Sequence, residues 1–408
     1  MEDKTLCKGL SITAIVLIAI SAILLSFNSA NGILYGDEAT FYGIPFIAAF
    51  AIPLLIILIV LSHYINNTDT VENMIAAVAV RYAIFGWFFV FFFKFCVILM
   101  EIFFKDFFYE HFSAIYLIMN SINVSVIGTL VLSIALRKLP AVKIEKRKMK
   151  IRQLLFLIMI MYGITQVGSI MGLPIHTALS AFSVQDESEI GTELANMLFS
   201  SNMVIRIITV GIMPAIFEEL LFRKFLIDRT IRHGEFISCA MSGIMFGLWH
   251  GNFQQFFFAF FIGVLFAFVY IRTGNIIYTM IMHASMNLVT ATVTLQLLVG
   301  LIEKMGIDLN DGTFDPNINY DELLTNVLPI LFLMMIWIIL LAGFQITGFI
   351  FAIIKRKNFK LVAMEGEPGR KVLLHKLTHS VEMWVFFSLA ILLFVYSYMP
   401  DIIAFIYK

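Results

Sequence analysis

Charged residues are scarce in this chain of 408 residues. Only 14% of its residues are charged, against about 25% in an ordinary soluble domain. The 28 basic and 28 acidic residues cancel, so no net field attracts a polyanion, and we expect no nucleic-acid partner. With 60% hydrophobic residues and a mean hydropathy of +0.93, the composition excludes a soluble globular protein and a disordered chain. It indicates a polytopic membrane protein.

Cysteine is also rare. Cys7, Cys96 and Cys239 lie far apart in the sequence, and no two of them form a CxxC pair. We therefore expect neither a disulfide framework nor a thiolate metal site.

Long apolar runs are abundant instead. A helix needs about 20 mostly apolar residues to span a bilayer, and we expect eleven such helices. Their approximate ranges are 9–27, 43–64, 75–103, 112–136, 153–174, 202–226, 236–252, 254–271, 275–298, 325–354 and 382–404. The predicted fold class is therefore all-α, a polytopic transmembrane helix bundle with about 11 spans.

The distribution of Lys and Arg between the loops predicts the orientation. Segment 137–152 holds eight basic residues and one acid, Glu145, so we place it in the cytoplasm. Loop 175–200 then falls outside, and it contains no Lys or Arg. Its acidic residues are Asp186, Glu187, Glu189 and Glu193. We predict a multi-pass protein of the cell membrane with a cytoplasmic N-terminus.

Polar content divides the chain into three parts. Residues 1–150 form a four-span N-terminal extension with the basic loop. Residues 151–298 hold five spans and nearly all of the deeply placed charge, and residues 299–408 add an acidic outer loop and two C-terminal spans. Inserting an ionisable side chain within a span costs at least about 2.5–3.5 kcal/mol, so we expect the functional site in the middle part.

Some charged residues lie within a few turns of a span end. They are Arg81, Lys94, Glu101 and Arg206. Long side chains at such positions can extend to the membrane interface, so these four residues predict no site.

Two adjacent carboxylates, Glu218 and Glu219, interrupt an otherwise apolar span. Consecutive residues of a helix point about 100° apart, so the two acids cannot share one role. Glu219 and Arg223 are four residues apart with the acid first, which is the favourable order for an ion pair on one helix face. Glu218 has no such partner, and an unpaired carboxylate in a low-dielectric site suits a general base that works near neutrality.

Further polar residues lie on two later spans. His250 follows Phe246 by four residues, and His283 and Asn287 share one face of their helix. One carboxylate, two imidazoles and an amide can activate a water molecule and stabilise an oxyanion. Counting along the chain places His250 near the outer end of its span, away from Glu218. Either that helix starts later than expected, or the turn after His250 is buried within the bundle.

Three motifs thus follow one another on separate predicted helices. They are EExxxR (Glu218, Glu219, Arg223), FxxxH (Phe246, His250) and HxxxN (His283, Asn287). In this order they resemble the CPBP intramembrane glutamic endopeptidases. That family includes the type II CAAX prenyl proteases and bacterial relatives linked to bacteriocin maturation or self-immunity. The resemblance covers about 203–297, and it implies cofactor-free hydrolysis of a peptide bond by a glutamate-activated water, without a covalent intermediate.

The resemblance also implies roles for single residues. Glu218 resembles the family's general base and His250 its partner in holding the water, while His283 and Asn287 resemble the oxyanion-stabilising pair. The supporting positions match Glu219, Arg223 and Phe246. The implied partners are membrane lipids and a membrane-bound or lipidated peptide or protein substrate.

Two alternatives stay open at this point. Two histidines and a glutamate are a plausible zinc set, although the chain has no HExxH and the ligands would come from separate helices. A non-enzymatic immunity, transport or scaffold protein of the membrane could instead use the same polar cluster to hold its helices together.

Overall fold

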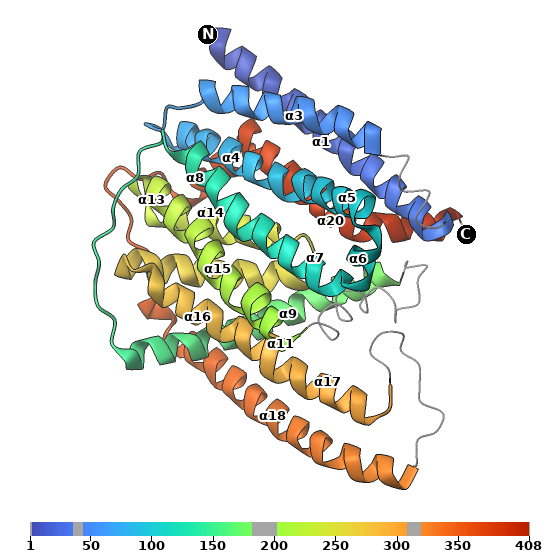
Figure 1. The fold of residues 1–408 in the computed structure, drawn as a ribbon. Helices are drawn as coiled ribbons and strands as arrows, with labels where there is room; N and C mark the ends of the chain where they lie inside the picture. Colours follow the sequence, from blue (N-terminus) through green and yellow to red (C-terminus); the bar gives the residue numbers. More distant parts are fainter. Residues whose placement is uncertain (1, 36–43, 182–201, 308–319, 408) are drawn as a thin grey trace.

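The structure is a computed structural model that describes residues 2–35, 44–181, 202–307 and 320–407. The regular elements in these ranges are helices (Figure 1). The α-helices are α1 (Glu2–Tyr35), α3 (Ile44–Tyr64), α4 (Val71–Trp87), α5 (Phe93–Phe103), α6 (Lys105–Glu110), α7 (Phe112–Ser121), α8 (Thr129–Leu136), α9 (Ile151–Ser180), α11 (Met203–Arg206), α12 (Met213–Glu219), α13 (Leu226–Thr230), α14 (Glu235–Trp249), α15 (Phe253–Thr273), α16 (Ile276–Leu288), α17 (Leu295–Lys304), α18 (Tyr320–Ile354), α19 (Arg370–His379) and α20 (Val381–Tyr407).

The predicted multi-pass helical architecture is confirmed. Each of the eleven predicted spans coincides with a helical segment, and eight helices in the described ranges are long and apolar enough to cross a membrane. Helices α1 and α9 extend beyond their predicted ends, whereas α14 is shorter than a full span. The acidic residues of the predicted outer loop, Asp186, Glu187, Glu189 and Glu193, lie outside the described residues.

Several long helices contain π-helical segments. These segments are η1 (Phe88–Phe92), η2 (Ile122–Gly128), η3 (Ile207–Ile212), η4 (Leu220–Phe225) and η6 (Val289–Thr294). A π segment widens a turn of the helix, so the residues after it face in a new direction, and such segments are frequent at functional sites. Segments η3 and η4 flank α12, which carries Glu218 and Glu219.

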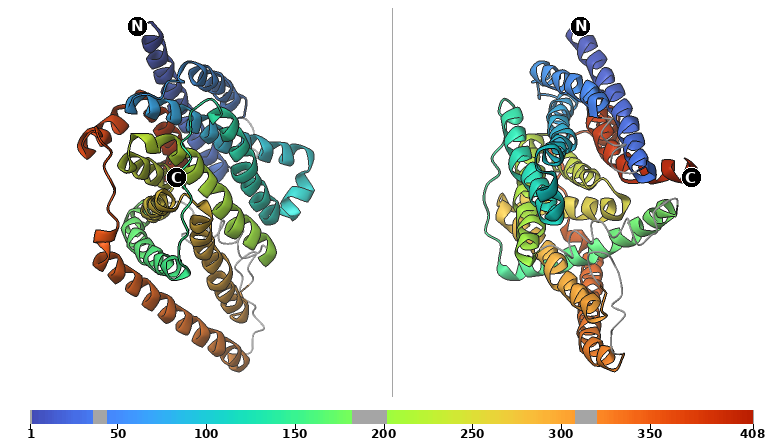
Figure 2. Two further views of the ribbon diagram at one scale, coloured as in Figure 1. Left: turned by 90° about the vertical axis from the view of Figure 1, so that its left-hand side faces the viewer. Right: turned by 45° about the vertical axis from the view of Figure 1, so that its right-hand side comes forward.

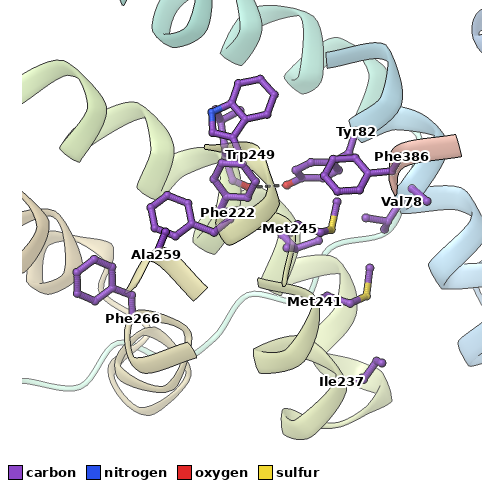
Figure 3. Close-up of a cluster of buried hydrophobic side chains, with 14 of the residues drawn as sticks. Val78, Tyr82, Phe222, Ile237, Met241, Met245, Trp249, Ala259, Phe266 and Phe386 are labelled. Atoms are coloured by element: carbon purple, nitrogen blue, oxygen red, sulfur yellow. Dashed lines mark hydrogen bonds between the residues drawn. The ribbon is translucent and has the colours of Figure 1, made fainter. Parts of the chain in front are cut away.

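The main buried cluster joins all three parts of the chain (Figure 3). Tyr82 and Phe85 come from α4, Phe222 from η4, Trp249 from α14 and Phe386 from α20. The rings of Phe85 and Trp249 stack with their centroids 4.4 Å apart. Helices from the N-terminal and C-terminal parts therefore pack directly on the helices that carry the motifs.

A second buried cluster lies where α1, α3, α4 and α20 meet. Ile18 of α1, Leu54 and Leu58 of α3, Ala83 of α4 and Leu389 of α20 belong to it. Figure 2 shows α1 running beside α20 at one edge of the bundle. The first and last helices of the chain thus hold each other in place.

Helix α18 is held against α9 where two glycines meet. A Cβ atom on Gly163 of α9 would lie 2.1 Å from the backbone nitrogen of Phe349, and one on Gly348 of α18 would lie 1.8 Å from the carbonyl oxygen of Met159. No side chain fits there, so the two backbones touch. Away from this crossing most side chains of α18 face outward, and α18 lies at the edge of the bundle (Figure 1).

Loops rich in Lys and Arg meet at one end of the bundle. The backbone N–H of Val142 donates to the carbonyl of Asp228 at 2.6 Å, and that of Arg147 donates to the carbonyl of Thr273 at 2.7 Å. The chain segments at this end, which we call the basic end, are 137–150, 228–235, 272–275 and 355–369.

Two charged residues near span ends do not extend to the membrane interface as expected. Arg81 is buried, and its guanidinium donates to the carbonyls of Ile65 (2.8 Å) and Ala135 (3.1 Å). These carbonyls lie at the ends of α3 and α8, where helical N–H donors run out. Arg206 is also buried, and it donates to Gln296 at 2.9 Å. Both arginines instead bond polar groups inside the protein.

Candidate active site

The two carboxylates lie on α12, a short helix between η3 and η4. Pro214 occupies its first turn, and a proline has no N–H to donate to the preceding turn. The carbonyl of Val210, in that preceding turn, accepts a hydrogen bond from the side-chain amide of Asn287 at 3.1 Å. Asn287 therefore links α16 to the segment just before α12, beside the carboxylates.

Glu219 and Arg223 form the ion pair that their spacing predicts. Arg223 Nε lies 3.1 Å from Glu219 Oε2, and Nη2 donates to Oε1 at 3.2 Å. Nη1 donates to the hydroxyl of Ser242 on α14 at 2.9 Å. Both charged side chains are fully buried, so removal of either partner would leave an uncompensated charge inside the protein.

His283 lies between the two carboxylates. Its Nδ1 is 3.0 Å from Glu219 Oε1, and its Nε2 is 3.8 Å from Glu218 Oε2. A carboxylate only accepts, so the hydrogen on Nδ1 is donated to Glu219. The side chain of Glu218 keeps 13% of its surface exposed, whereas that of Glu219 keeps none. The two neighbouring acids thus have different surroundings, and Glu218 is the accessible one.

His250 approaches the same site from the end of α14. Its Nδ1 is 2.9 Å from the carbonyl oxygen of Phe246, so in a neutral ring Nδ1 carries the hydrogen and Nε2 the lone pair. The Phe246 ring lies 4.9 Å from the His250 ring and 5.9 Å from the His283 ring, centroid to centroid. The Arg223 guanidinium lies over the same Phe246 ring at 4.6 Å. One aromatic side chain therefore contacts both histidines and the arginine.

The depth of His250 follows from the length of α14. This helix has 15 residues and rises about 22 Å, less than the roughly 30 Å of a hydrocarbon core. The chain turns back at Gly251, whose φ is +68°. The Gly251 carbonyl accepts a hydrogen bond from Ser397 of α20 at 3.0 Å. Of the two explanations that the sequence allows, the buried turn is therefore the right one.

Two side chains outside the motifs support the site. The hydroxyl of Tyr82 on α4 donates to the carbonyl of Leu221 at 2.5 Å, shown as a dashed line in Figure 3. The Phe266 ring on α15 lies 5.7 Å from the His283 ring and 5.4 Å from the Arg223 guanidinium. Sequence reasoning missed both residues. The available signal was a tyrosine well inside a span, since tyrosine favours the membrane interfaces.

The donor set does not fit the zinc alternative. In the part of the chain that the structure describes, no group of three or more His, Cys, Asp or Glu side chains is placed to hold a metal ion. Glu219 is already bonded to Arg223 and His283.

Residues 200–289 match the family of Rce1-like, type II CAAX prenyl endopeptidases. The chain carries an Rce1-like domain. All seven motif residues, from Glu218 to Asn287, lie inside the matched range, so the family indicated by the three motifs is confirmed for this segment. No curated protein and no solved structure matches the chain.

The family matched by residues 200–289 is one of endopeptidases, and this supports a protease activity in general terms. The matched segment lies in a bundle with helices long enough to cross a membrane. Helices α4 and α20 lie outside the matched range but pack on it through Tyr82 and Phe386. The surroundings of the motif residues are therefore completed by helices from both ends of the chain.

Proposed function

We propose that the chain is an intramembrane endopeptidase whose Glu218 activates water to hydrolyse a membrane-associated or lipidated peptide or protein. The observation that carries the proposal is the difference between the two acids. Glu219 is held by Arg223 and His283, whereas Glu218 stays accessible beside Nε2 of His283. An accessible carboxylate enclosed by apolar helices suits a general base.

In the proposed reaction, Glu218 accepts a proton from a water molecule, and the water oxygen forms a bond to the carbon of the scissile carbonyl. The lone pair on Nε2 of His250 accepts the second hydrogen of the same water and so orients it. The C–N bond then breaks, and the proton held by Glu218 passes to the departing amine. No bond forms between enzyme and substrate.

We assign the stabilisation of the oxyanion to His283 and Asn287. Asn287 has a second amide hydrogen besides the one donated to Val210. His283 donates from Nδ1 to Glu219, and it stabilises the oxyanion when Nε2 also carries a hydrogen. Glu219, Arg223 and Phe246 hold these donors in place. The reaction needs no cofactor in this scheme.

The basic end is proposed to face the cytoplasm of a cell, with the N-terminus on that side of the cell membrane. The support is the gathering of Lys-rich and Arg-rich loops at this end, since such loops remain in the cytoplasm. We also propose the division into a 1–150 N-terminal extension with the basic cytoplasmic loop, a 151–298 protease core, and a 299–408 part with the acidic outer loop and two C-terminal spans. The buried packing is shared among all three.

The test uses the full chain reconstituted in liposomes together with solubilised membrane proteins. We expect new peptide termini with the wild-type protein and none with Glu218→Gln, because an amide cannot accept the proton. The matched control is Glu303→Gln at the exposed end of α17, which should cleave like the wild type. Cleavage that survives Glu218→Gln in folded protein would exclude the proposal.

A non-enzymatic scaffold is the second candidate, and one observation favours it: Glu219 and Arg223 are fully buried and bonded to each other. In that case Glu218→Gln and His283→Ala would change stability or assembly, and no cleavage would be found in any sample. The liposome assay distinguishes the two candidates when it is run beside an unfolding measurement on the same variants.

A further inference from the structure

A cavity of about 250 Å³ lies between α9, α15 and α18, away from the motif residues. Its walls are mostly apolar: Ile160 and Ile164 come from α9, Phe261 and Phe268 from α15, and Ala352 from α18. Several of these side chains are only half-buried, so the space can be reached from the outer surface of the bundle.

The crossing of α9 and α18 explains why the cavity exists. The two backbones touch at Gly163 and Gly348, and the cavity lies beside this contact, between the outlying α18 and the central α15. A space lined by apolar groups offers water no hydrogen-bond partners. In a bilayer, the neighbouring material that fits such a space is a lipid acyl chain.

The mouth of the cavity is positively charged. Arg356, two residues after the end of α18, lines the cavity, and Lys355, Lys357 and Lys360 are close to it in the sequence. Within the described residues none of these four side chains forms an ion pair with a carboxylate; the Arg356 guanidinium donates only to the carbonyl of Ile353, at 3.2 Å. The mouth therefore carries positive charge without a protein counter-ion.

A nearby arginine provides a contrast. Arg272 lies over the Phe268 ring at 4.9 Å, yet it is paired with Glu235 through Nη1 and Nη2 of its guanidinium. Its charge is therefore neutralised within the protein, whereas the charge of Arg356 is left for a ligand.

We propose that this cavity binds one anionic phospholipid, with an acyl chain between α9, α15 and α18 and the phosphate at Arg356. Basic pockets between membrane helices recognise such headgroups. The bound chain would lie along Phe268 and Phe261 of α15, while Phe266 on the same helix contacts His283. The lipid would therefore brace the helix that supports the site. The proposal does not depend on peptidase activity.

The test is native mass spectrometry of the purified, delipidated full chain with phosphatidylglycerol or phosphatidylcholine of identical acyl chains. We expect one tightly bound phosphatidylglycerol and weaker binding of phosphatidylcholine. Arg356→Gln should weaken phosphatidylglycerol binding about five-fold, as for the loss of one basic group at an anionic headgroup. Ala352→Phe should weaken the binding of both lipids by filling the cavity.

Two matched controls make the result specific. Arg137→Gln removes an exposed charge at the same end, and Ile353→Phe adds the same ring on the outward face of α18; both should bind like the wild type. Equal binding of the two lipids by the wild type would overturn the proposal. An equal loss of phosphatidylglycerol binding in Arg137→Gln would also overturn it, because it would indicate diffuse electrostatic attraction. Displacement of the phospholipid by a lipidated peptide would overturn it as well, because the cavity would then be a substrate groove. If Ala352→Phe does not fold, the phosphatidylglycerol binding of Arg356→Gln, compared with that of Arg137→Gln, tests the proposal.

Discussion

Glu218 and Glu219 are neighbours in the sequence with opposite surroundings. Consecutive residues of a helix point in different directions. Glu219 therefore contacts Arg223 and Nδ1 of His283, while Glu218 faces Nε2 of the same imidazole ring and stays partly exposed. A substitution at either position removes one carboxylate, but the expected consequences differ. Loss of Glu219 or Arg223 should affect folding first, and loss of Glu218 should affect turnover.

The buried ion pair gives a stability prediction. Arg223→Ala leaves Glu219 buried without its arginine partner, with only the hydrogen bond from His283, a change that costs about 3–5 kcal/mol in the free energy of unfolding. Arg137→Ala, an exposed arginine, should stay within about 0.5 kcal/mol of the wild type. Chemical unfolding in detergent measures both. Equal stabilities would mean that the pair contributes nothing.

Asn287 has two assigned roles, and both depend on its side-chain amide. Asn287→Ala removes the side-chain donor to the Val210 carbonyl and should lower the free energy of unfolding by about 1–3 kcal/mol. It should also slow cleavage, because the proposed oxyanion donor is missing. Chemical unfolding in detergent and the liposome assay measure the two effects. An unchanged stability would refute the structural role of the Val210 contact.

At the scale of single elements, α12 is short and flanked by π segments, and a side chain from another helix holds its C-terminal side. Tyr82→Phe removes the donor to the Leu221 carbonyl and should lower the free energy of unfolding by about 1–3 kcal/mol. It should also slow cleavage, because η4, which follows directly after Glu218 and Glu219, loses a contact. Tyr407→Phe, at an exposed tyrosine of α20, is the control. An unchanged Tyr82→Phe variant would show that α12 needs no such support.

The contact between α9 and α18 gives a second prediction at this scale. Gly163→Ala places a methyl group against the α18 backbone, so the helices must separate, with an expected loss of about 1–3 kcal/mol. The control is Gly343→Ala on α18, where the new methyl group meets nothing within 4 Å and the change should be neutral or slightly stabilising. Thermal unfolding of the two variants compares them. A similar melting temperature for both would contradict the close crossing.

At the scale of the whole molecule, local patterns were predictable and long-range packing was not. Apolar runs define the spans, and the spacing of Glu219 and Arg223 predicts their ion pair, because both signals lie within one helix. The contact of Tyr82 with η4 joins residues 139 positions apart, and no local pattern encodes it. The buried turn after His250 and the carbonyl contacts of Arg81 likewise depend on which helices become neighbours.

The central claim, that Glu218 makes this bundle a protease, is tested most directly by comparing membrane peptidomes. Cells would carry the wild-type protein, Glu218→Gln or Glu303→Gln at matched abundance, and new peptide termini would be identified by mass spectrometry. We predict that a precursor accumulates, and its shortened product disappears, only with Glu218→Gln. If the precursor is shortened equally with all three proteins, Glu218 is not the base and the account is contradicted.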